Sequence, residues 1–253
     1  MIELKQVSKS FGNRHILNGV NLSVADGETL VILGASGSGK STILKLIIGL
    51  LQPDAGDVLI HGQNVTAITE DAWNKVRRHM GMVFQYSALF DSMTIGENVA
   101  FGLRQHENMT EEQIQTVVRE KLHMVGLDGI ESLMPSSLSG GMKKRVSLAR
   151  AIALNPEIIL YDEPTAGLDP IRSTAISHLI RDMQEKMHVT SIVVTHDMKS
   201  AGEIADRMAF LYEGSFLATG TPDELYQSPD PRVQQFIHGW EFPEMPQKEG
   251  EME

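Results

Sequence analysis

The amino-acid sequence predicts a mixed α/β protein, and three observations support that prediction. Residues 29–33 form a continuous apolar run, as expected of a strand buried on both faces, and a glycine-rich turn and a helix follow it. From about residue 94 to residue 154 the periodicity is largely helical. After Asn155-Pro156, strand and helix patterns alternate again. We therefore expect an α/β core that is interrupted by a helical insertion.

The N-terminal part of the chain predicts β structure with one helix. Its predicted strands alternate between apolar and polar side chains or, in one case, are apolar throughout. They are residues 2–7, 16–24, 29–33 and 57–61. Asp26-Gly27 predicts a turn before the third strand, and the helix over residues 40–50 ends before Pro53.

The rest of the chain predicts helices and four further strands. The helix start signals are Thr110-Glu-Glu-Gln113, Ser139-Gly-Gly, Asp169-Pro170 and Thr221-Pro-Asp-Glu224. The second of these opens a helix over residues 142–154, and a further helix is predicted over residues 197–205. The predicted strands are residues 157–161, 191–195, 208–212 and 215–219.

Composition and charge limit the class of protein. The 253 residues carry 33 acidic and 22 basic side chains, a formal net charge of −11, whereas proteins that bind nucleic acid across their surface usually show the opposite balance. The absence of Cys excludes a disulfide framework and a Cys nucleophile. No apolar run approaches the about 20 residues that span a bilayer, and the N-terminus lacks a signal-peptide pattern. We expect a protein that reaches a membrane only through a partner.

The glycine-rich turn carries the clearest chemical signal. Residues 34–41 read Gly-Ala-Ser-Gly-Ser-Gly-Lys-Ser and fit G-x-x-x-x-G-K-[ST] in full. Glycines let backbone N–H groups converge on phosphate oxygens, and the helix N-terminus adds partial positive charge. Lys40 is predicted to reach the β- and γ-phosphates, and Ser41 to ligate Mg²⁺. The predicted phosphate-binding residues are Gly34, Ser36, Gly37, Ser38, Gly39, Lys40, Ser41 and Thr42.

Three more polar side chains follow predicted buried strands. Asp162 and Glu163 come at the end of the strand over residues 157–161, and His196 follows the strand over residues 191–195. In open α/β sheets, ligands bind at the carboxyl ends of the strands. We expect Asp162 to hold Mg²⁺, Glu163 to polarise an attacking water, and His196 to hydrogen-bond a γ-phosphate oxygen.

A second glycine-rich helix start lies at residues 138–141, Leu-Ser-Gly-Gly. Such a helix N-terminus either binds an anion or is an ordinary serine N-cap. Because one nucleotide needs one cradle, the second predicts binding to a nucleotide held by another copy, in a head-to-tail homodimer. The residues of this second cradle are Ser139, Gly140 and Gly141. For the basic residues 143–145 that follow, we expect a solvated face rather than a nucleic-acid contact.

These motifs and their order resemble those of the ATPase subunits of ABC transporters, over about residues 1–240. Residues 34–41 resemble Walker A, Asp162-Glu163 resembles Walker B, and residues 138–141 resemble the signature that distinguishes this family. The resemblance implies further roles. They are adenine stacking for Phe11, coupling to the membrane domain for Gln85, a D-loop at residues 166–169 and a switch histidine at His196.

The resemblance also implies the architecture: a P-loop NTPase (RecA-like) core with an N-terminal antiparallel β subdomain and an inserted α-helical subdomain. The expected ABC ATPase domain covers residues 1–240, with its core at about 1–86 and 155–240 and its helical subdomain at about 87–154. An acidic tail follows at residues 241–253. The implied cofactors are ATP and Mg²⁺. The implied metal ligands are Ser41, Gln85 and Asp162. The implied catalytic residues are Glu163, His196, Lys40 and Gln85.

One departure from the family pattern narrows the substrate. Met142 follows the signature where the family usually has Gln, and Leu-Ser-Gly-Gly-Met is typical of the ATPases that work with Mce proteins, the Mla-type branch. Residues 88–90, 133–136 and 229–233 resemble that branch too. The resemblance implies phospholipid trafficking between the inner and outer membranes, which maintains lipid asymmetry. An importer of a polar solute such as an amino acid has the same mechanism and stays an alternative.

Classes outside transport fit less well. A DNA-repair ATPase of this type needs a long coiled-coil insertion, a P-loop kinase lacks the signature, and a GTPase needs an Asn-Lys-x-Asp motif. The implied partners are permease subunits, an Mce-type substrate-binding protein and a small cytoplasmic regulatory subunit, with a peripheral location on the cytoplasmic side of the inner membrane. Leu89, Phe90 and Met93 either line the groove that docks the permease or belong to the core.

Overall fold

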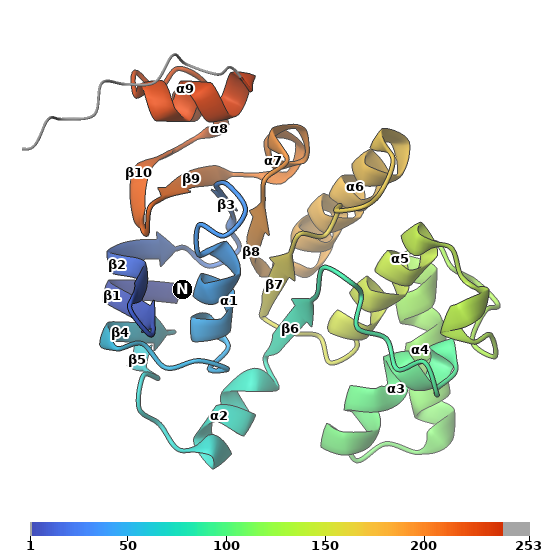
Figure 1. Ribbon diagram of the computed structural model, residues 1–253. Coiled ribbons are helices and arrows are strands. Elements are labelled where there is room, and N and C mark those ends of the chain that lie inside the picture. Colours follow the sequence, from blue (N-terminus) through green and yellow to red (C-terminus); the bar gives the residue numbers. More distant parts are fainter. Residues whose placement is uncertain (1, 240–253) are drawn as a thin grey trace, which may run out of the picture.

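A six-stranded sheet forms the centre of the computed structural model, which describes residues 2–239 (Figure 1). Its strands in spatial order are β10 (Ser215–Gly220), β9 (Arg207–Tyr212), β3 (Thr29–Leu33), β8 (Thr190–Thr195), β7 (Ile158–Asp162) and β6 (Met80–Val83). Neighbouring strands run parallel except in the β9–β10 hairpin. The carboxyl ends of β3, β6, β7 and β8 therefore meet at one edge of the sheet.

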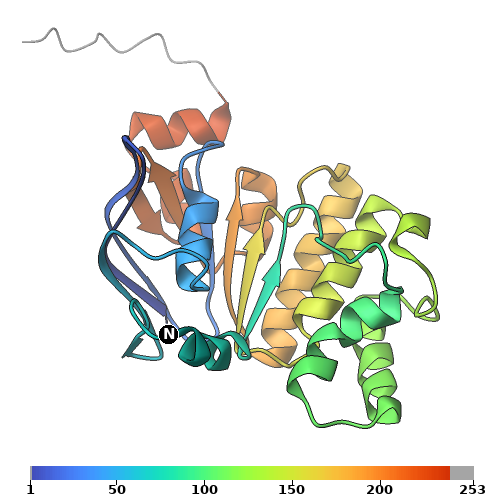
Figure 2. The same ribbon diagram turned by 60° about the horizontal axis from the view of Figure 1, so that its bottom comes forward.

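A separate antiparallel sheet is built from the N-terminal part of the chain. Its strands in spatial order are β2 (Arg14–Val24), β1 (Ile2–Phe11), β4 (Ala55–Ile60) and β5 (Gln63–Asn64). Helix α1 (Lys40–Ile47) lies between this sheet and the six-stranded sheet (Figures 1 and 2). Leu30 and Ile32 of β3 share a core with α1 and the antiparallel sheet, whereas Val31 and Leu33 face a second core. This alternation explains why all of β3 is buried.

Helices cover the other face of the six-stranded sheet. The helices of this second core are α3 (Ile95–His106), α4 (Glu111–Met124), α5 (Gly140–Ala151), α6 (Pro170–Met187) and α7 (Met198–Ile204). Of these, α3, α4 and α5 pack against one another beyond the edge strand β6 (Figure 2). The remaining helices are α2 (Glu70–Arg77), α8 (Pro222–Tyr226) and α9 (Pro231–His238), and Leu225 of α8 and Val233 of α9 also belong to the second core. Within residues 2–239, the helices lack the length and apolar character required to cross a membrane.

The predicted α/β class is confirmed, and three elements, α2, β5 and β6, went unpredicted. Helix α2 has a sequence signal, because Thr69 accepts a hydrogen bond from the Ala72 amide and the first turn is acidic. Strand β6 has only four residues, one of which is Gly81, so its alternation is too short to read. The insertion is also less helical than predicted, because residues 125–139 contain only a single 3-10 turn.

Two predicted helices have different bounds in the structure. Helix α1 ends at Ile47 rather than at residue 50, because Gly49 takes a positive φ of 70° and reverses the chain. Helix α5 begins at Gly140 rather than at Met142 and ends at Ala151 rather than at residue 154. The predicted acidic tail at residues 241–253 lies outside the described residues.

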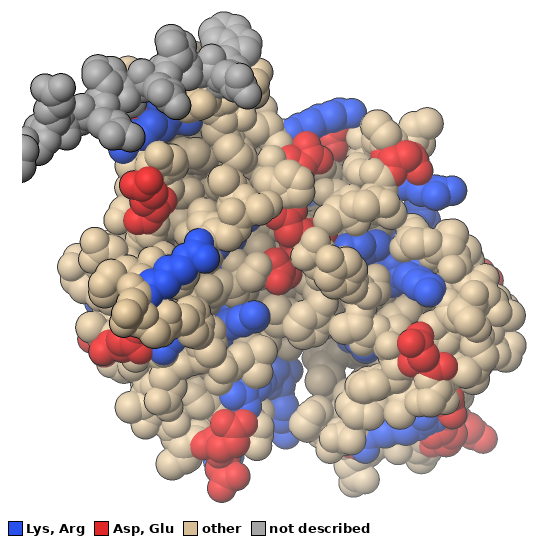
Figure 3. All heavy atoms as spheres, viewed as in Figure 1, with Lys and Arg blue, Asp and Glu red and all other residues tan. Residues whose placement is uncertain are grey.

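Charged side chains of both signs are mixed on the face shown in Figure 3. Lys and Arg lie beside Asp and Glu over this face and form no continuous basic stripe on it. Attraction of a phosphate group at this face must therefore come from a few local groups rather than from a broad positive field.

Candidate active site

The loop of residues 34–39 joins β3 to α1 at the carboxyl edge of the six-stranded sheet. Gly39 is the N-cap of α1, with φ at 108°, and among the described residues no side chain caps this helix. Gly37 also has a positive φ, of 79°. The first amide groups of α1 are therefore left for a ligand, which is the arrangement that binds phosphate.

Packing of neighbouring strands fixes the shape of this loop. A Cβ atom on Gly34 would collide with the carbonyl oxygen of Leu211 in β9. A Cβ atom on Gly39 would lie 3.0 Å from Cγ2 of Ile16 in β2. Glycine at these two positions thus lets both sheets hold the loop in its binding conformation before a nucleotide arrives.

Lys40 is the first residue of α1, and its side chain points back into the loop. Its ammonium donates hydrogen bonds to the carbonyl oxygens of Gly34 (2.8 Å) and Ala35 (3.1 Å) and lies 3.8 Å from Oε1 of Glu163. Burial lowers the pKa of Lys40, and the carboxylates of Glu163 and Asp162 oppose this shift. The chain thus holds a cation against neutral carbonyls that phosphate oxygens can replace.

Asp162 and Ser41 meet at the end of β7. The Ser41 hydroxyl donates a hydrogen bond of 2.8 Å to Oδ1 of Asp162, although the two residues are far apart in sequence. Hydroxyl and carboxylate oxygens are ligands that Mg²⁺ prefers, usually together with waters and substrate phosphates. The donor set at this position therefore fits a magnesium ion.

Glu163 is held from several sides in a strained conformation. Its φ is 47°, in a region that costs a residue other than glycine about 1–3 kcal/mol. Its amide donates to the carbonyl oxygen of Val194 (2.9 Å), and its carboxylate accepts a hydrogen bond from the Thr195 hydroxyl (3.2 Å). Nδ1 of His196 lies 3.0 Å from both carboxylate oxygens. The carboxylate is thus held beside the Lys40 ammonium.

Gln85 reaches the same edge through β6, whose Val83 pairs with Tyr161 of β7. Its carbonyl oxygen accepts a hydrogen bond from the ammonium of Lys144, which also donates to the carbonyl oxygen of Glu163 (3.2 Å). The predicted solvated face at residues 143–145 is therefore wrong, because Lys144 is only 5% exposed and its neighbours are half-buried. A signal was present: Lys144 follows buried Gly141 by three residues and precedes buried Leu148 by four.

The second glycine-rich helix start belongs to a different helix and a different core from the P-loop of residues 34–41. Ser139 is the N-cap of α5, and its hydroxyl oxygen accepts a hydrogen bond from the amide of Met142 (3.3 Å). Ser139 and Gly140 are exposed, whereas Gly141 is buried. Helices α1 and α5 belong to the cores on opposite faces of the sheet. The structure thus separates Ser139, Gly140 and Gly141 from the other predicted site residues of the same chain.

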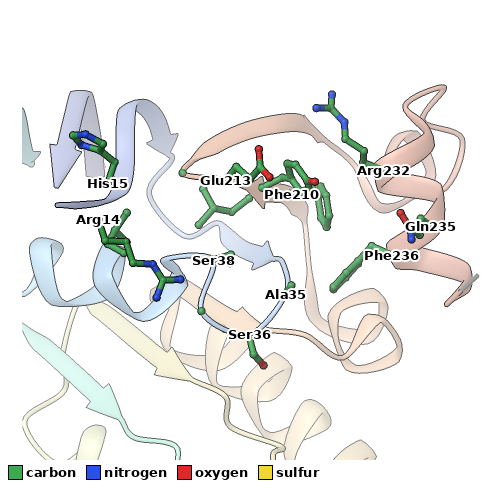
Figure 4. A pocket seen from close by; sticks show the side chains of 15 residues that line it. Arg14, His15, Ala35, Ser36, Ser38, Phe210, Glu213, Arg232, Gln235 and Phe236 are labelled. Carbon is green, nitrogen blue, oxygen red and sulfur yellow. The ribbon is translucent and has the colours of Figure 1, made fainter. Parts of the chain in front are cut away.

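A cavity of about 550 Å³ lies beside the P-loop (Figure 4). Its lining residues come from the loop itself, the start of β2, the β9–β10 turn and α9. Figure 4 shows Arg14 on one side of Ser36 and Arg232 and Phe236 on the other. The cavity lining does not include Phe11, which lies half-exposed at the end of β1 with the Lys9 ammonium 5.6 Å from its ring centroid. Arg14 carries no motif, and Arg232 lies in the branch-like segment 229–233 with no signal for a place beside the P-loop, so sequence reasoning missed both residues at this cavity.

Comparison with known proteins identifies the family. Residues 17–166 match the ABC transporter family. The chain is 44% identical to MlaF, the intermembrane phospholipid transport ATP-binding protein of Haemophilus influenzae, over 94% of this chain and 90% of that protein. It is 42% identical to mkl, a probable ribonucleotide transport ATP-binding protein of Mycobacterium leprae, over 94% and 69% of the two chains.

A solved structure agrees with this result. It is a dimeric ATP-binding cassette in a post-hydrolysis state, bound to ADP and Pi, with a TM-score of 0.81 and 36% identity over 88% of this chain and 99% of that one. With the P-loop and the two carboxylates at one sheet edge, these matches establish both the nucleotide and the reaction. The chain belongs to the ABC transporter family and is an ATP-binding, ATP-hydrolysing subunit of it.

Proposed function

We propose that this chain powers an ABC system that moves phospholipid between the inner and outer membranes. The observation that carries the proposal is the 44% identity to a phospholipid transport ATPase, because it extends over 90% of that protein. The Met142 that follows the signature, where the family usually has Gln, agrees with the same branch.

The residues at the sheet edge have separate roles in the proposed reaction. Amides of the P-loop and the Lys40 ammonium bind the β- and γ-phosphates. Ser41, Asp162 and Gln85 would hold Mg²⁺, which supplies charge compensation at the phosphates. Glu163 accepts a proton from the attacking water, and His196 holds the Glu163 carboxylate in place and contacts the γ-phosphate.

The exposed start of α5 supports a head-to-tail homodimer. Ser139 and Gly140 are exposed and begin a helix of the other core, so they would close over a γ-phosphate held by a second copy. The match to a dimeric cassette supports this arrangement. Each dimer then contains two composite sites, each with a P-loop from one subunit and a signature from the other.

Exposed aromatic residues that follow Gln85 in the chain and a cavity of mixed polar and apolar lining on α3 support docking to a membrane permease. A cavity of about 210 Å³ is lined by Met93, Glu97, Phe101, Arg104 and Gln105 of the α3 region. The Phe90 ring packs on Phe101 with the ring centroids 4.8 Å apart, and Tyr86 is 87% exposed. A permease helix seated here would place the chain on the cytoplasmic side of the inner membrane. An Mce-type protein and a small regulatory subunit complete the proposed assembly.

A second candidate function rests on the mkl relatives. Their name describes probable ribonucleotide transport, and they are 42% identical to this chain, nearly as similar as MlaF. The same motor would then drive a polar solute. The site residues are the same for both functions, so only the membrane partners distinguish them.

Reconstitution tests the proposed function. The chain is purified with its membrane partners and incorporated into vesicles that contain fluorescent phospholipid. We expect ATP-dependent transfer of phospholipid and none with Glu163→Gln, whose catalytic carboxylate is missing. Stimulation of the ATPase by ribonucleotides or amino acids, with no phospholipid binding or transfer, would favour the second candidate.

A further inference from the structure

Lys144 is a buried cation of the site that the proposed reaction does not use. It is 5% exposed, and its ammonium is satisfied by two main-chain carbonyl oxygens, those of Gln85 and Glu163. A buried ammonium is unfavourable unless its donors are paired. Here the paired groups lie just beyond the ends of two neighbouring strands, β6 and β7, while the cation belongs to α5. Lys144 thus joins three separate elements at one point.

The two carbonyl groups belong to residues whose positions matter for hydrolysis. Glu163 has a positive φ of 47°, so its backbone depends on its partners to stay in place. Its carbonyl oxygen accepts from Lys144 and from the amide of Ala166 (3.2 Å). Because a peptide group is rigid, a cation that fixes this oxygen also limits the direction of the Glu163 side chain. The same ammonium fixes the main chain at Gln85.

Further along α5, Arg150 contacts the loop after β6, the loop that also contains Gln85. Its guanidinium donates to the carbonyl oxygens of Ser87 (2.8 Å) and Ala88 (2.7 Å), which both have positive φ. Near this end, α5 packs so tightly on β6 that a Cβ atom on Gly81 would lie 2.5 Å from the carbonyl oxygen of Ala151. The far end of α5 is therefore fixed, and Lys144 is the link closest to the Ser139 end.

We propose that Lys144 is a positioning residue that couples the N-terminal end of α5 to the catalytic carboxylate of its own subunit. A shift of α5 when Ser139 engages a nucleotide moves the Gln85 and Glu163 backbones together through this cation. The inference rests on the catalytic role proposed for Glu163. It concerns communication between the Ser139 end of α5 and the Glu163 carboxylate within one subunit, in addition to the chemistry at each of them.

Lys144→Met in the full-length chain tests the inference, because Met keeps the length and burial of the side chain but donates no hydrogen bond. Lys143→Met, one residue earlier on the same helix, is the matched control. We expect kcat for ATP to fall about tenfold to a hundredfold in Lys144→Met, as for a small misplacement of a catalytic group. KM and the melting temperature should stay at the control values. Lys144→Arg, which restores donors, should recover most of kcat.

The lack of Cys allows a direct readout of the coupling. Tyr86→Cys places a single fluorescent label next to Gln85 at an exposed position. ATP should change the signal of this label in the parent and in Lys143→Met, and the change should be lost in Lys144→Met.

The results separate this inference from the proposed role of Glu163. If Glu163→Gln abolishes turnover while Lys144→Met has the kcat and the label response of Lys143→Met, only the inference is overturned. A melting temperature that falls together with kcat, without recovery in Lys144→Arg, would make Lys144 a structural residue and also overturn it. Normal turnover in Glu163→Gln would instead remove the role on which the inference rests.

Discussion

Two helices of this chain begin at glycine-rich turns, and their surroundings differ. Gly39 is the N-cap of α1, which no side chain of the described residues caps, and Lys40, Asp162 and Glu163 lie close by. Ser139 is the N-cap of α5, and its own hydroxyl caps the helix. Beside it, a cavity of about 170 Å³ is lined in part by Arg145 and Arg172. Both helix starts have the partial positive charge that favours anions, but of the two only the first has Asp162 and Glu163 beside it, the carboxylates of the proposed reaction.

The comparison indicates that a glycine-rich helix start alone can favour phosphate binding, whereas the residues for hydrolysis must come from neighbouring strands. Four parallel strands bring the catalytic groups to α1, because their carboxyl ends share one edge of the sheet. Helix α5 lies on the opposite core and keeps only the amides, the serine and nearby arginines. In the proposed dimer it would therefore contribute half of a site to a second subunit.

The largest expected effect comes from a substitution that removes the proposed catalytic carboxylate beside α1. Glu163→Gln keeps the size and shape of the side chain but replaces one acceptor oxygen with an NH2 donor and cannot accept a proton from water, so kcat should fall about 10²–10⁴-fold. ATP affinity should stay at the parent value, because the P-loop amides and Lys40 are unchanged. Steady-state turnover and equilibrium binding of a fluorescent ATP analogue measure the two quantities. Near-normal hydrolysis would exclude Glu163 as the residue that activates water.

The next largest effect tests whether the start of α5 binds the nucleotide of the other subunit. Ser139→Arg blocks the start of α5, and Lys40→Ala disables the P-loop. Mixed dimers with one change in each subunit should keep one intact composite site and hydrolyse ATP. Mixed dimers with both changes in one subunit should have two damaged sites and hydrolyse none. Equal activity of the two arrangements would contradict the composite-site proposal.

The α1 site and much of the fold could be predicted from the sequence because the motifs that indicate them are contiguous runs of residues. The P-loop is eight consecutive residues, and Asp162-Glu163 directly follows an apolar strand. The capping boxes at Thr94, Thr110 and Thr221 form as their spacing requires, and that spacing was read for the last two. Such local rules hold because the interacting groups lie within one turn.

What the sequence could not reveal depends on distant partners. Helical spacing places Lys144 on the buried side of α5, but a run of three basic residues reads as a solvated face, and the carbonyl groups after β6 and β7 that pair with Lys144 are not visible in the sequence. Arg14 and Arg232 meet at one cavity only because β2 and α9 flank the P-loop. Strand β6 escapes detection because its four residues owe their conformation to β7 and to close packing under α5.

The smallest expected effect distinguishes the helix-capping role of Ser139 from its proposed contact with a phosphate. Its hydroxyl oxygen accepts from the Met142 amide, which leaves its proton free to donate to a phosphate of the partner. Ser139→Ala should lower the free energy of unfolding by about 1 kcal/mol, the usual loss of an N-cap. Thr110→Ala removes the equivalent cap of α4 and should cost about the same. Denaturant titration measures these changes. Only Ser139→Ala should also lower kcat, and an equal kcat in both variants would make Ser139 a cap alone.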